Sequence, residues 1–217
     1  MTRSVHPLAG AIAALGRFVS GVQVRWDGCQ PQPRQRVYFA NHTSHLDFVV
    51  LWSALPAGLR AVTRPVAAKD YWEKGLRAYL ALRVFRAVLV ARGAGARGDP
   101  EQTRAAGHAV IEILAEALGQ TDSLIFFPEG TRGTGEEVAP FRSGLYHLAR
   151  RRPDVQLVPA YLENLNRILP KGEVLPVPLV SSLTFGQPIH LAADETKTAF
   201  LARAREVVCR LRRGGLA

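Results

Sequence analysis

The chain of 217 residues has few cysteines and no apolar run long enough to cross a membrane. Cys29 and Cys209 lie far apart and without the spacing of a metal site, which excludes a disulfide framework and fits a reducing compartment. The most apolar stretch, residues 8–22, contains three glycines and Arg17 and falls short of the ~20 residues that a span requires. It also lacks an obvious cleavage site, so we expect a short amphipathic helix at an interface rather than a signal peptide.

Acidic residues are also scarce, with 18 Asp and Glu against 28 Lys and Arg, which leaves a net charge of +10. The excess is concentrated between Arg60 and Arg97, where nine basic residues stand against Asp70 and Glu73. Such a chain could bind nucleic acid, an anionic membrane or small phosphorylated substrates. No motif for reading bases accompanies the charge, and the basic residues are interleaved with large apolar ones. We therefore expect an anionic membrane surface as a partner, and no nucleic acid.

Internal repeats, low-complexity segments and convincing linkers are absent from the sequence. We expect an N-terminal amphipathic segment over residues 1–22 and a single domain over residues 23–217. Strand-like segments alternate with segments of helical periodicity, which predicts an α/β fold with a mixed, largely parallel central sheet flanked by helices. Strands are expected near residues 36–40, 60–68, 87–91, 123–127, 155–162 and 176–185, and helices near 44–55, 72–85, 99–118, 143–151 and 195–211.

The most informative motif is NHTSHLD at residues 41–47, where a strand is expected to end and a helix to begin. On a continuous helix, His42 and Asp47 would point about 140° apart, so they can meet only if His42 lies in the turn and Ser44 caps the helix. Asp47 could then accept a hydrogen bond from one imidazole nitrogen and leave the other free to take a proton from a substrate hydroxyl. Alternatively, Ser44 and Asp47 form only a capping box and His42 is a polar turn residue.

His45 opens another alternative, in which His42, His45 and Asp47 bind a metal ion for a hydrolase. Three ligands at this spacing match no common zinc pattern, and no distant cluster of ligands accompanies them. We therefore expect no metal and interpret His45 as structural. The sequence also lacks a G-x-S-x-G elbow, and neither cysteine stands in a recognisable reactive setting. These absences favour general-base chemistry over a covalent enzyme intermediate.

A second motif, FPEGTR at residues 127–132, follows another expected strand. Pro128 ends the strand, and Gly130 tolerates backbone shapes and close approaches that other residues do not. Exposed N–H groups in this turn, together with the guanidinium of Arg132, would form a cradle for a phosphate. Taken alone, the motif could equally be a plain turn. Arg92, which follows the expected strand at 87–91, could contact phosphate or face solvent.

Taken together and in order along the chain, these residues resemble the sequence blocks of the glycerolipid acyltransferase family, which includes 1-acylglycerol-3-phosphate acyltransferase. The resemblance spans residues 42–160. Beyond it, residues 165–173 add a polar stretch to which we assign no role, and this departure bears on the identity of the acceptor. The matching segments are residues 42–47 (H-x4-D), 85–92 (the second block), 127–132 (F-P-E-G-T-R) and 158–160 (the proline-bearing fourth block).

The resemblance implies that the domain over residues 23–217 transfers a fatty acyl group to the free hydroxyl of lysophosphatidic acid. The donor would be a thioester of coenzyme A or of acyl carrier protein, and no further cofactor is expected. His42 would be the general base and Asp47 its partner. The residues implied to hold the glycerol phosphate are Lys69, Arg92, Glu129, Gly130, Thr131 and Arg132.

Several alternatives remain open at this point. The same residues could acylate glycerol 3-phosphate or another lysophospholipid, and the non-enzymatic alternative is a basic lipid-binding or nucleic-acid-binding module. Residues 71–86 mix aromatic and basic side chains, which suits either an interfacial helix or a core-facing helix with a solvated side. We expect the protein at the cytoplasmic face of the membrane, peripheral or monotopic.

Overall fold

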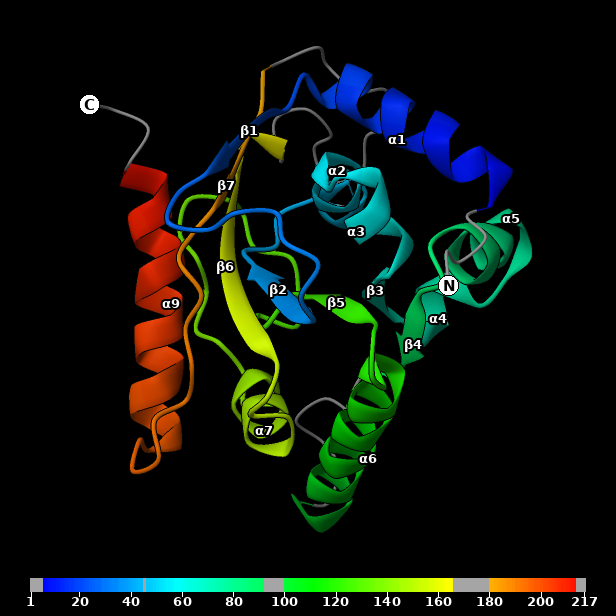
Figure 1. Ribbon diagram of the computed structural model, residues 1–217. Coiled ribbons are helices and arrows are strands. Elements are labelled where there is room, and N and C mark those ends of the chain that lie inside the picture. Colours follow the sequence, from blue (N-terminus) through cyan, green and yellow to red (C-terminus); the bar gives the residue numbers. More distant parts are fainter. Residues whose placement is uncertain (1–5, 45, 92–99, 166–179, 214–217) are drawn as a thin grey trace.

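The computed structural model describes residues 6–44, 46–91, 100–165 and 180–213. Its centre is a seven-stranded sheet with the order β1-β7-β6-β2-β5-β3-β4 (Figure 1). The strands from β6 to β4 run parallel, β7 is antiparallel to β6, and β1 is parallel to β7. The expected mixed, largely parallel sheet is therefore confirmed. The strands are β1 (Gln23–Trp26), β2 (Arg36–Ala40), β3 (Thr63–Ala68), β4 (Val88–Val90), β5 (Ser123–Phe126), β6 (Gln156–Glu163) and β7 (Ser182–Phe185).

Each face of the sheet is covered by its own helices, because successive residues of a strand point to opposite faces. In β2, Tyr38 and Ala40 belong to a core shared with α1, α2 and α3, whereas Val37 and Phe39 belong to a core shared with α6, α7 and α9 (Figure 1). All of β2 is buried, including Arg36, and burial on both faces explains the apolar run over residues 37–40. The helices are α1 (Pro7–Ser20), α2 (Asp47–Ala54), α3 (Ala57–Ala61), α4 (Lys69–Trp72), α5 (Gly75–Tyr79), the π-helix η1 (Leu80–Val84), α6 (Pro100–Leu118), α7 (Gly144–Arg151) and α9 (Lys197–Arg213).

The expected N-terminal helix is present as α1, and it packs on α2 through small side chains. Ala9, Ala13 and Ser20 are buried, and a Cβ placed on Gly16 would lie 2.8 Å from Oγ of Ser53 in α2. These positions recur at helical spacing and form the inner side of α1. Its outer side carries Leu8, Leu15 and Phe18, which are 46%, 61% and 84% exposed.

Two expectations about local structure were wrong. The single helix expected over residues 72–85 is divided into α4, α5 and η1, because Gly75 has a φ of 58° and interrupts the helical path. The last piece is a π-turn, in which the N–H of Phe85 donates to the carbonyl of Leu80. The helix expected from Ser44 begins at Asp47 instead, and the backbone N–H of Ser44 donates to the Asp47 carboxylate.

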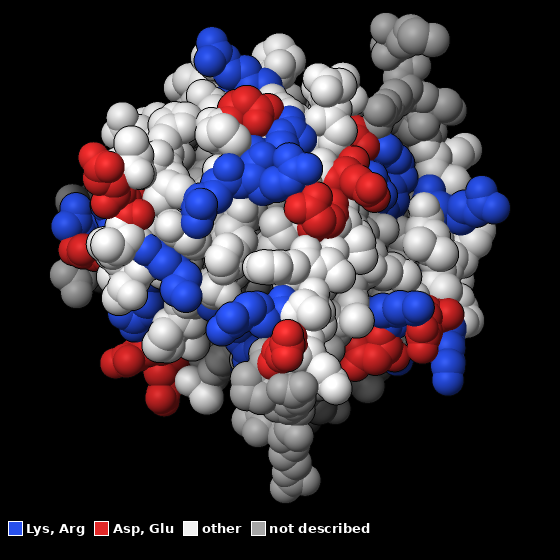
Figure 2. Space-filling view, turned by 90° about the horizontal axis from the view of Figure 1, so that it is seen from below, with Lys and Arg blue, Asp and Glu red and all other residues white. Residues whose placement is uncertain are grey.

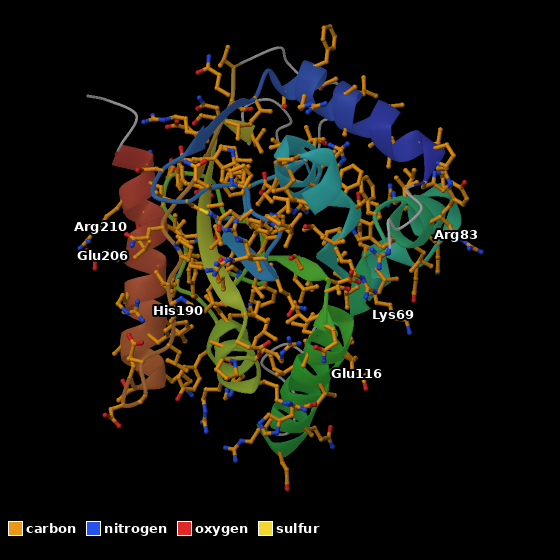
Figure 3. The ribbon with its side chains drawn as sticks, viewed as in Figure 1. Lys69, Arg83, Glu116, His190, Glu206 and Arg210 are labelled. Atoms are coloured by element: carbon orange, nitrogen blue, oxygen red, sulfur yellow. The ribbon has the colours of Figure 1, made fainter. Side chains whose placement is uncertain are left out.

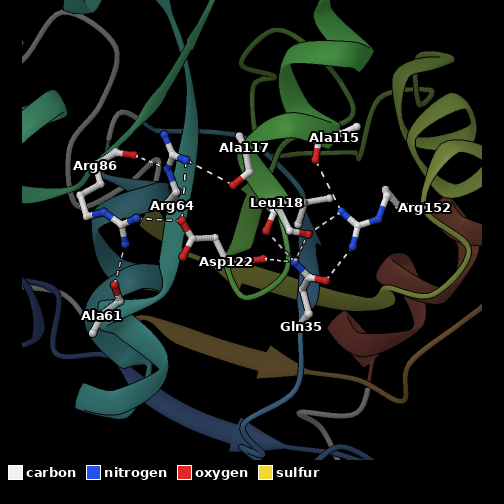
Figure 4. A network of polar contacts seen from close by, with 10 residues as sticks. Gln35, Ala61, Arg64, Arg86, Ala115, Ala117, Leu118, Asp122 and Arg152 are labelled. Atoms are coloured by element: carbon white, nitrogen blue, oxygen red, sulfur yellow. Dashed lines mark hydrogen bonds and ion pairs between the residues drawn. The ribbon is translucent and has the colours of Figure 1, made fainter. Parts of the chain in front are cut away.

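Part of the basic segment is engaged inside the fold rather than free at its surface. Asp122, which is 5% exposed, accepts a hydrogen bond from Arg86 at 2.8 Å and forms an ion pair with Arg64 at 3.7 Å (Figure 4). Arg86 and Arg64 also donate to the carbonyls of Ala61 and Ala117, respectively. Arg86 was expected on an interfacial helix, but these contacts tie it to the start of β5.

The remaining charges are not gathered into one field on the face seen in Figure 2. There, Lys and Arg side chains lie in several groups with Asp or Glu side chains beside them. Within the described ranges, no helix combines the length and the apolar character needed to cross a bilayer.

Candidate active site

The predicted site residues follow the carboxyl ends of neighbouring parallel strands. Phe39 of β2 is opposite Phe126 of β5, and Pro65 of β3 is opposite Ile125 of β5. His42 follows β2, Glu129 follows β5 and Lys69 follows β3, and the backbone N–H of His42 donates to Oε1 of Glu129 at 2.6 Å. The carboxyl edge of the sheet therefore brings both predicted motifs together.

His42 is held by Asp47, as expected from the sequence. Nδ1 of His42 lies 2.8 Å from Oδ2 of Asp47, and the same oxygen accepts the backbone N–H groups of Thr43 at 2.6 Å and Ser44 at 2.9 Å. The Asp47 side chain is fully buried, whereas 22% of the His42 side chain is exposed. An ionised carboxylate can only accept hydrogen bonds, so Nδ1 must carry the proton and Nε2 of the neutral ring is left with a free lone pair.

The motif thus combines the two readings of the sequence. The bond from the Ser44 N–H to Asp47 is one half of a capping box, and the same carboxylate also orients the imidazole. The ring of Phe127 stacks on the His42 ring, with centroids 4.3 Å apart and planes 21° apart. These contacts fix the orientation of the imidazole ring and place its proton on Nδ1.

Glu129 joins the two motifs through its buried carboxylate. Oε1 accepts the backbone N–H of His42 at 2.6 Å, and Oε2 accepts the backbone N–H of Ala139 at 2.9 Å. The N–H of Gly133 in turn donates to the carbonyl of His42 at 2.8 Å. Burial raises the pKa of the Glu129 carboxyl, while its hydrogen bonds with Ala139 and His42 act in the opposite direction. One oxygen of this predicted substrate-binding residue therefore holds the loop that carries His42, and the other holds the backbone at Ala139.

The FPEGTR turn presents fewer free N–H groups than the sequence suggested. The N–H of Gly130 donates to the carbonyl of Phe127 at 3.1 Å, so it is already used. Thr131 is exposed and Arg132 is half-buried. Within the ranges that the structure describes, no carboxylate forms an ion pair with Arg132, so its guanidinium is available to an anion.

Of the other predicted residues, Lys69 is exposed at the first position of α4, on the side of the molecule away from α9 (Figure 3). Arg92, His45 and residues 166–173 lie outside the described residues. Among the described residues, no three His, Cys, Asp or Glu side chains come together as metal ligands.

Sequence reasoning missed two residues that contact the motifs. Asn41 donates from Nδ2 to the carbonyl of Leu162 and accepts the Leu162 N–H, each at 2.8 Å, which ties the end of β2 to β6. Arg142 donates from Nε to the carbonyl of Glu129 at 3.1 Å. Asn41 directly precedes His42 and could have been suspected. Arg142 is ten residues beyond the FPEGTR motif, and nothing in its local sequence indicates this contact.

Known proteins resemble this chain in sequence and in fold. A family model described as Acyltransferase matches residues 22–163. The chain is 30% identical over 171 residues to a 1-acyl-sn-glycerol-3-phosphate acyltransferase of Limnanthes douglasii, with 77% of this chain and 56% of the relative covered. It is 27% identical over 215 residues to the 1-acyl-sn-glycerol-3-phosphate acyltransferase alpha of Homo sapiens, with 92% and 70% covered.

The chain thus spans little more than half the length of the plant relative. Among solved structures, the 1-acyl-sn-glycerophosphate acyltransferase PlsC from Thermotoga maritima has a similar fold, with a TM-score of 0.70 at 19% identity. That match covers 97% of this chain and 80% of the other.

Proposed function

Because the chain belongs to the acyltransferase family, we propose that it transfers a fatty acyl group from an acyl thioester to the free hydroxyl of lysophosphatidic acid, which forms phosphatidic acid. The observation that carries this proposal is the 2.8 Å contact between His42 and Asp47, in a loop that Glu129 ties to the FPEGTR turn. The printed names of the relatives support this acceptor. Glycerol 3-phosphate or another lysophospholipid would use the same residues.

In the proposed mechanism, Nε2 of His42 takes the proton of the acceptor hydroxyl as its oxygen attacks the carbonyl carbon of the thioester. A C–O bond forms and the C–S bond breaks. The imidazolium then returns its proton to the departing thiolate of coenzyme A or acyl carrier protein, so no proton is gained or lost. Asp47 stabilises the transient positive charge on the ring. Lys69, Arg92 and Arg132 would hold the phosphate, and positioning of this kind can supply much of the rate.

An assay with matched substrates tests the proposal. The purified protein is offered labelled acyl-CoA or acyl-loaded carrier protein, each with lysophosphatidic acid, glycerol 3-phosphate or lysophosphatidylcholine. We expect labelled phosphatidic acid from lysophosphatidic acid with at least one donor, and full activity in the presence of a metal chelator. The proposal fails if no acceptor is acylated, and loss of activity on chelation would favour the metal-dependent hydrolase.

We also propose that the protein binds an anionic membrane surface through α1, α5 and η1. His6 Nε2, at the start of α1, lies 3.1 Å from Oη of Tyr79 in α5, so the two helices are neighbours. The thioester donors are cytoplasmic molecules, which points to the cytoplasmic leaflet. The side chains that would enter the interface are Leu8, Leu15, Phe18, Leu76, Tyr79 and Leu82, which are 45–84% exposed. The exposed basic side chains within or directly before α5 and η1 are Lys74, Arg77 and Arg83.

Vesicle flotation tests this surface. The Phe18→Asp/Leu76→Asp double variant is expected to bind vesicles of phosphatidylcholine and phosphatidylglycerol at least about 10-fold more weakly, because it places two charges where apolar side chains would be buried. Added salt should weaken wild-type binding, since each basic residue contributes ~1 kcal/mol near an anionic surface. The control is Ile113→Asp, at a 41% exposed position on α6. Equal flotation of wild type and double variant would contradict the proposed surface.

A further inference from the structure

Two features of the structure favour glycine at position 130, and only one of them is the backbone conformation. Its φ of 72° favours glycine, but the space beside it is also occupied. A Cβ placed on Gly130 would lie 2.8 Å from both Cδ and Nε of Arg142. Because Gly130 has no side chain, the Cδ and Nε atoms of Arg142 can pass close to the backbone of the FPEGTR turn.

Arg142 donates two hydrogen bonds to the FPEGTR turn, one from its backbone and one from its side chain. Its backbone N–H donates to the carbonyl of Pro128 at 2.8 Å, and its Nε donates to the carbonyl of Glu129 at 3.1 Å. The next residue toward the N-terminus, Phe141, is buried in the core and fixes the backbone. Glu129 is also the residue whose carboxylate holds the backbone of His42. Arg142, Glu129 and His42 therefore form a continuous chain of contacts.

The outer end of this guanidinium is left without a protein partner. Arg142 is exposed, and no described residue accepts a hydrogen bond from either of its terminal nitrogens or forms an ion pair with it. Arg132 in the same turn likewise has no ion pair within the described part of the chain. A guanidinium whose terminal nitrogens have no protein acceptor can donate paired hydrogen bonds to the oxygens of a phosphate monoester.

We infer that Arg142 is a phosphate-binding residue of the acceptor site, which acts together with Arg132 and is aimed by Gly130 and the carbonyl of Glu129. The inference rests on the proposed function, because the phosphate is that of the acceptor. It assigns Gly130 to the positioning of Arg142 rather than to direct contact with phosphate. It also adds to the site a residue that lies outside the sequence blocks.

Kinetics with two acceptors test the role of Arg142. Arg142→Ala is expected to raise the KM for lysophosphatidic acid about 10- to 100-fold, since a charge-assisted hydrogen bond to the phosphate is lost, and to change kcat less. Activity with monoacylglycerol, which lacks the phosphate, should stay within about twofold of wild type. Arg150→Ala is the matched control, because Arg150 is an exposed arginine at the far end of α7. It should behave as wild type with both acceptors.

A double-mutant cycle tests the role of Gly130. Gly130→Ala should raise the same KM, because the new methyl group displaces Arg142. Gly130→Ala/Arg142→Ala should be no worse than the more affected single variant, since both changes remove one interaction. If the increase in KM of the double variant equalled the product of the two single increases, Gly130 and Arg142 would act independently, and the proposed role of Gly130 would be wrong. Thermal unfolding checks that Gly130→Ala folds, and if it does not, Arg142→Ala alone decides.

Calorimetric titration with glycerol 3-phosphate separates this inference from the proposed reaction. Wild type should bind at least about 10-fold more tightly than Arg142→Ala. Equal affinity, no binding by either protein, or an equal loss of activity with monoacylglycerol would overturn the inference while leaving the reaction intact. If wild-type protein acylates no acceptor, the proposed function fails, and the titration still decides whether Arg142 binds phosphate.

Discussion

Replacement of His42 by alanine is expected to lower kcat about 100- to 10,000-fold, with KM for both substrates changed much less. The imidazole would be the only group that removes the proton from the acceptor hydroxyl, whereas the phosphate and thioester sites remain. Because 22% of the side chain is exposed, the fold should tolerate the change. Loss of the stack on Phe127 is expected to reduce the free energy of unfolding by only about 1 kcal/mol. Steady-state kinetics and thermal unfolding measure the two quantities.

His190→Ala is the matched control for this experiment. His190 is an exposed histidine beside α9, on the opposite side of the molecule from Lys69 (Figure 3). Its removal should leave kcat within about twofold of wild type. A His42→Ala enzyme with nearly full kcat would show that the hydroxyl loses its proton to another group, and the assignment of the base would have to be abandoned.

Replacement of Asp47 by alanine should lower kcat nearly as far as the loss of His42, about 100- to 10,000-fold. It removes the acceptor of Nδ1, so the ring loses both its orientation and its proton assignment. The free energy of unfolding should also fall, by about 1–3 kcal/mol for each backbone N–H that is left buried without an acceptor. The Thr43 and Ser44 N–H groups are the two concerned.

Two further variants show whether Asp47 acts through His42. Asp47→Asn keeps an oxygen acceptor but not the charge, so the gap between its kcat and that of Asp47→Ala separates geometry from electrostatics. In the His42→Ala background, Asp47→Ala should cause almost no additional loss of kcat, because residues that act as a unit are not additive. Asp154→Ala, at an exposed carboxylate, is the control. A full second loss in the double variant would mean that Asp47 contributes independently of the imidazole.

The pairing of His42 with Asp47 could be predicted because the two residues are only five positions apart, and a turn between them must bring the two side chains together. The sheet was predictable for a similar reason: residues 37–40 of β2 are a short apolar run, and strands alternate with helices along the chain. The strand β1 was not expected. Its four residues alternate between exposed and half-buried positions, and its partner β7 lies more than 150 residues further along the chain.

The contacts that complete the site could not be predicted in the same way. Glu129 was expected to hold phosphate, and the structure shows its oxygens accepting the backbone N–H groups of His42 and Ala139. The contact with His42 depends on the pairing of β2 with β5, which joins segments distant in the sequence. The role of Gly130 depends on the path of the Arg142 side chain, which no local pattern records. The basic segment appeared uniformly available, but Asp122, from a distant position in the sequence, engages part of it.

The contact between α1 and α2 at Gly16 is close, because a methyl group there would lie 2.8 Å from Oγ of Ser53 and 3.3 Å from Cγ1 of Val49 unless those side chains moved. The helix that α1 rests on begins with Asp47. α1 therefore packs directly on α2, the helix whose first residue, Asp47, orients the His42 imidazole. If α1 lies in a lipid leaflet, the packing of α1 on α2 sets the depth and tilt of His42 relative to the lipid headgroups. A bulkier residue at position 16 would then change that depth and tilt while leaving the catalytic side chains unchanged.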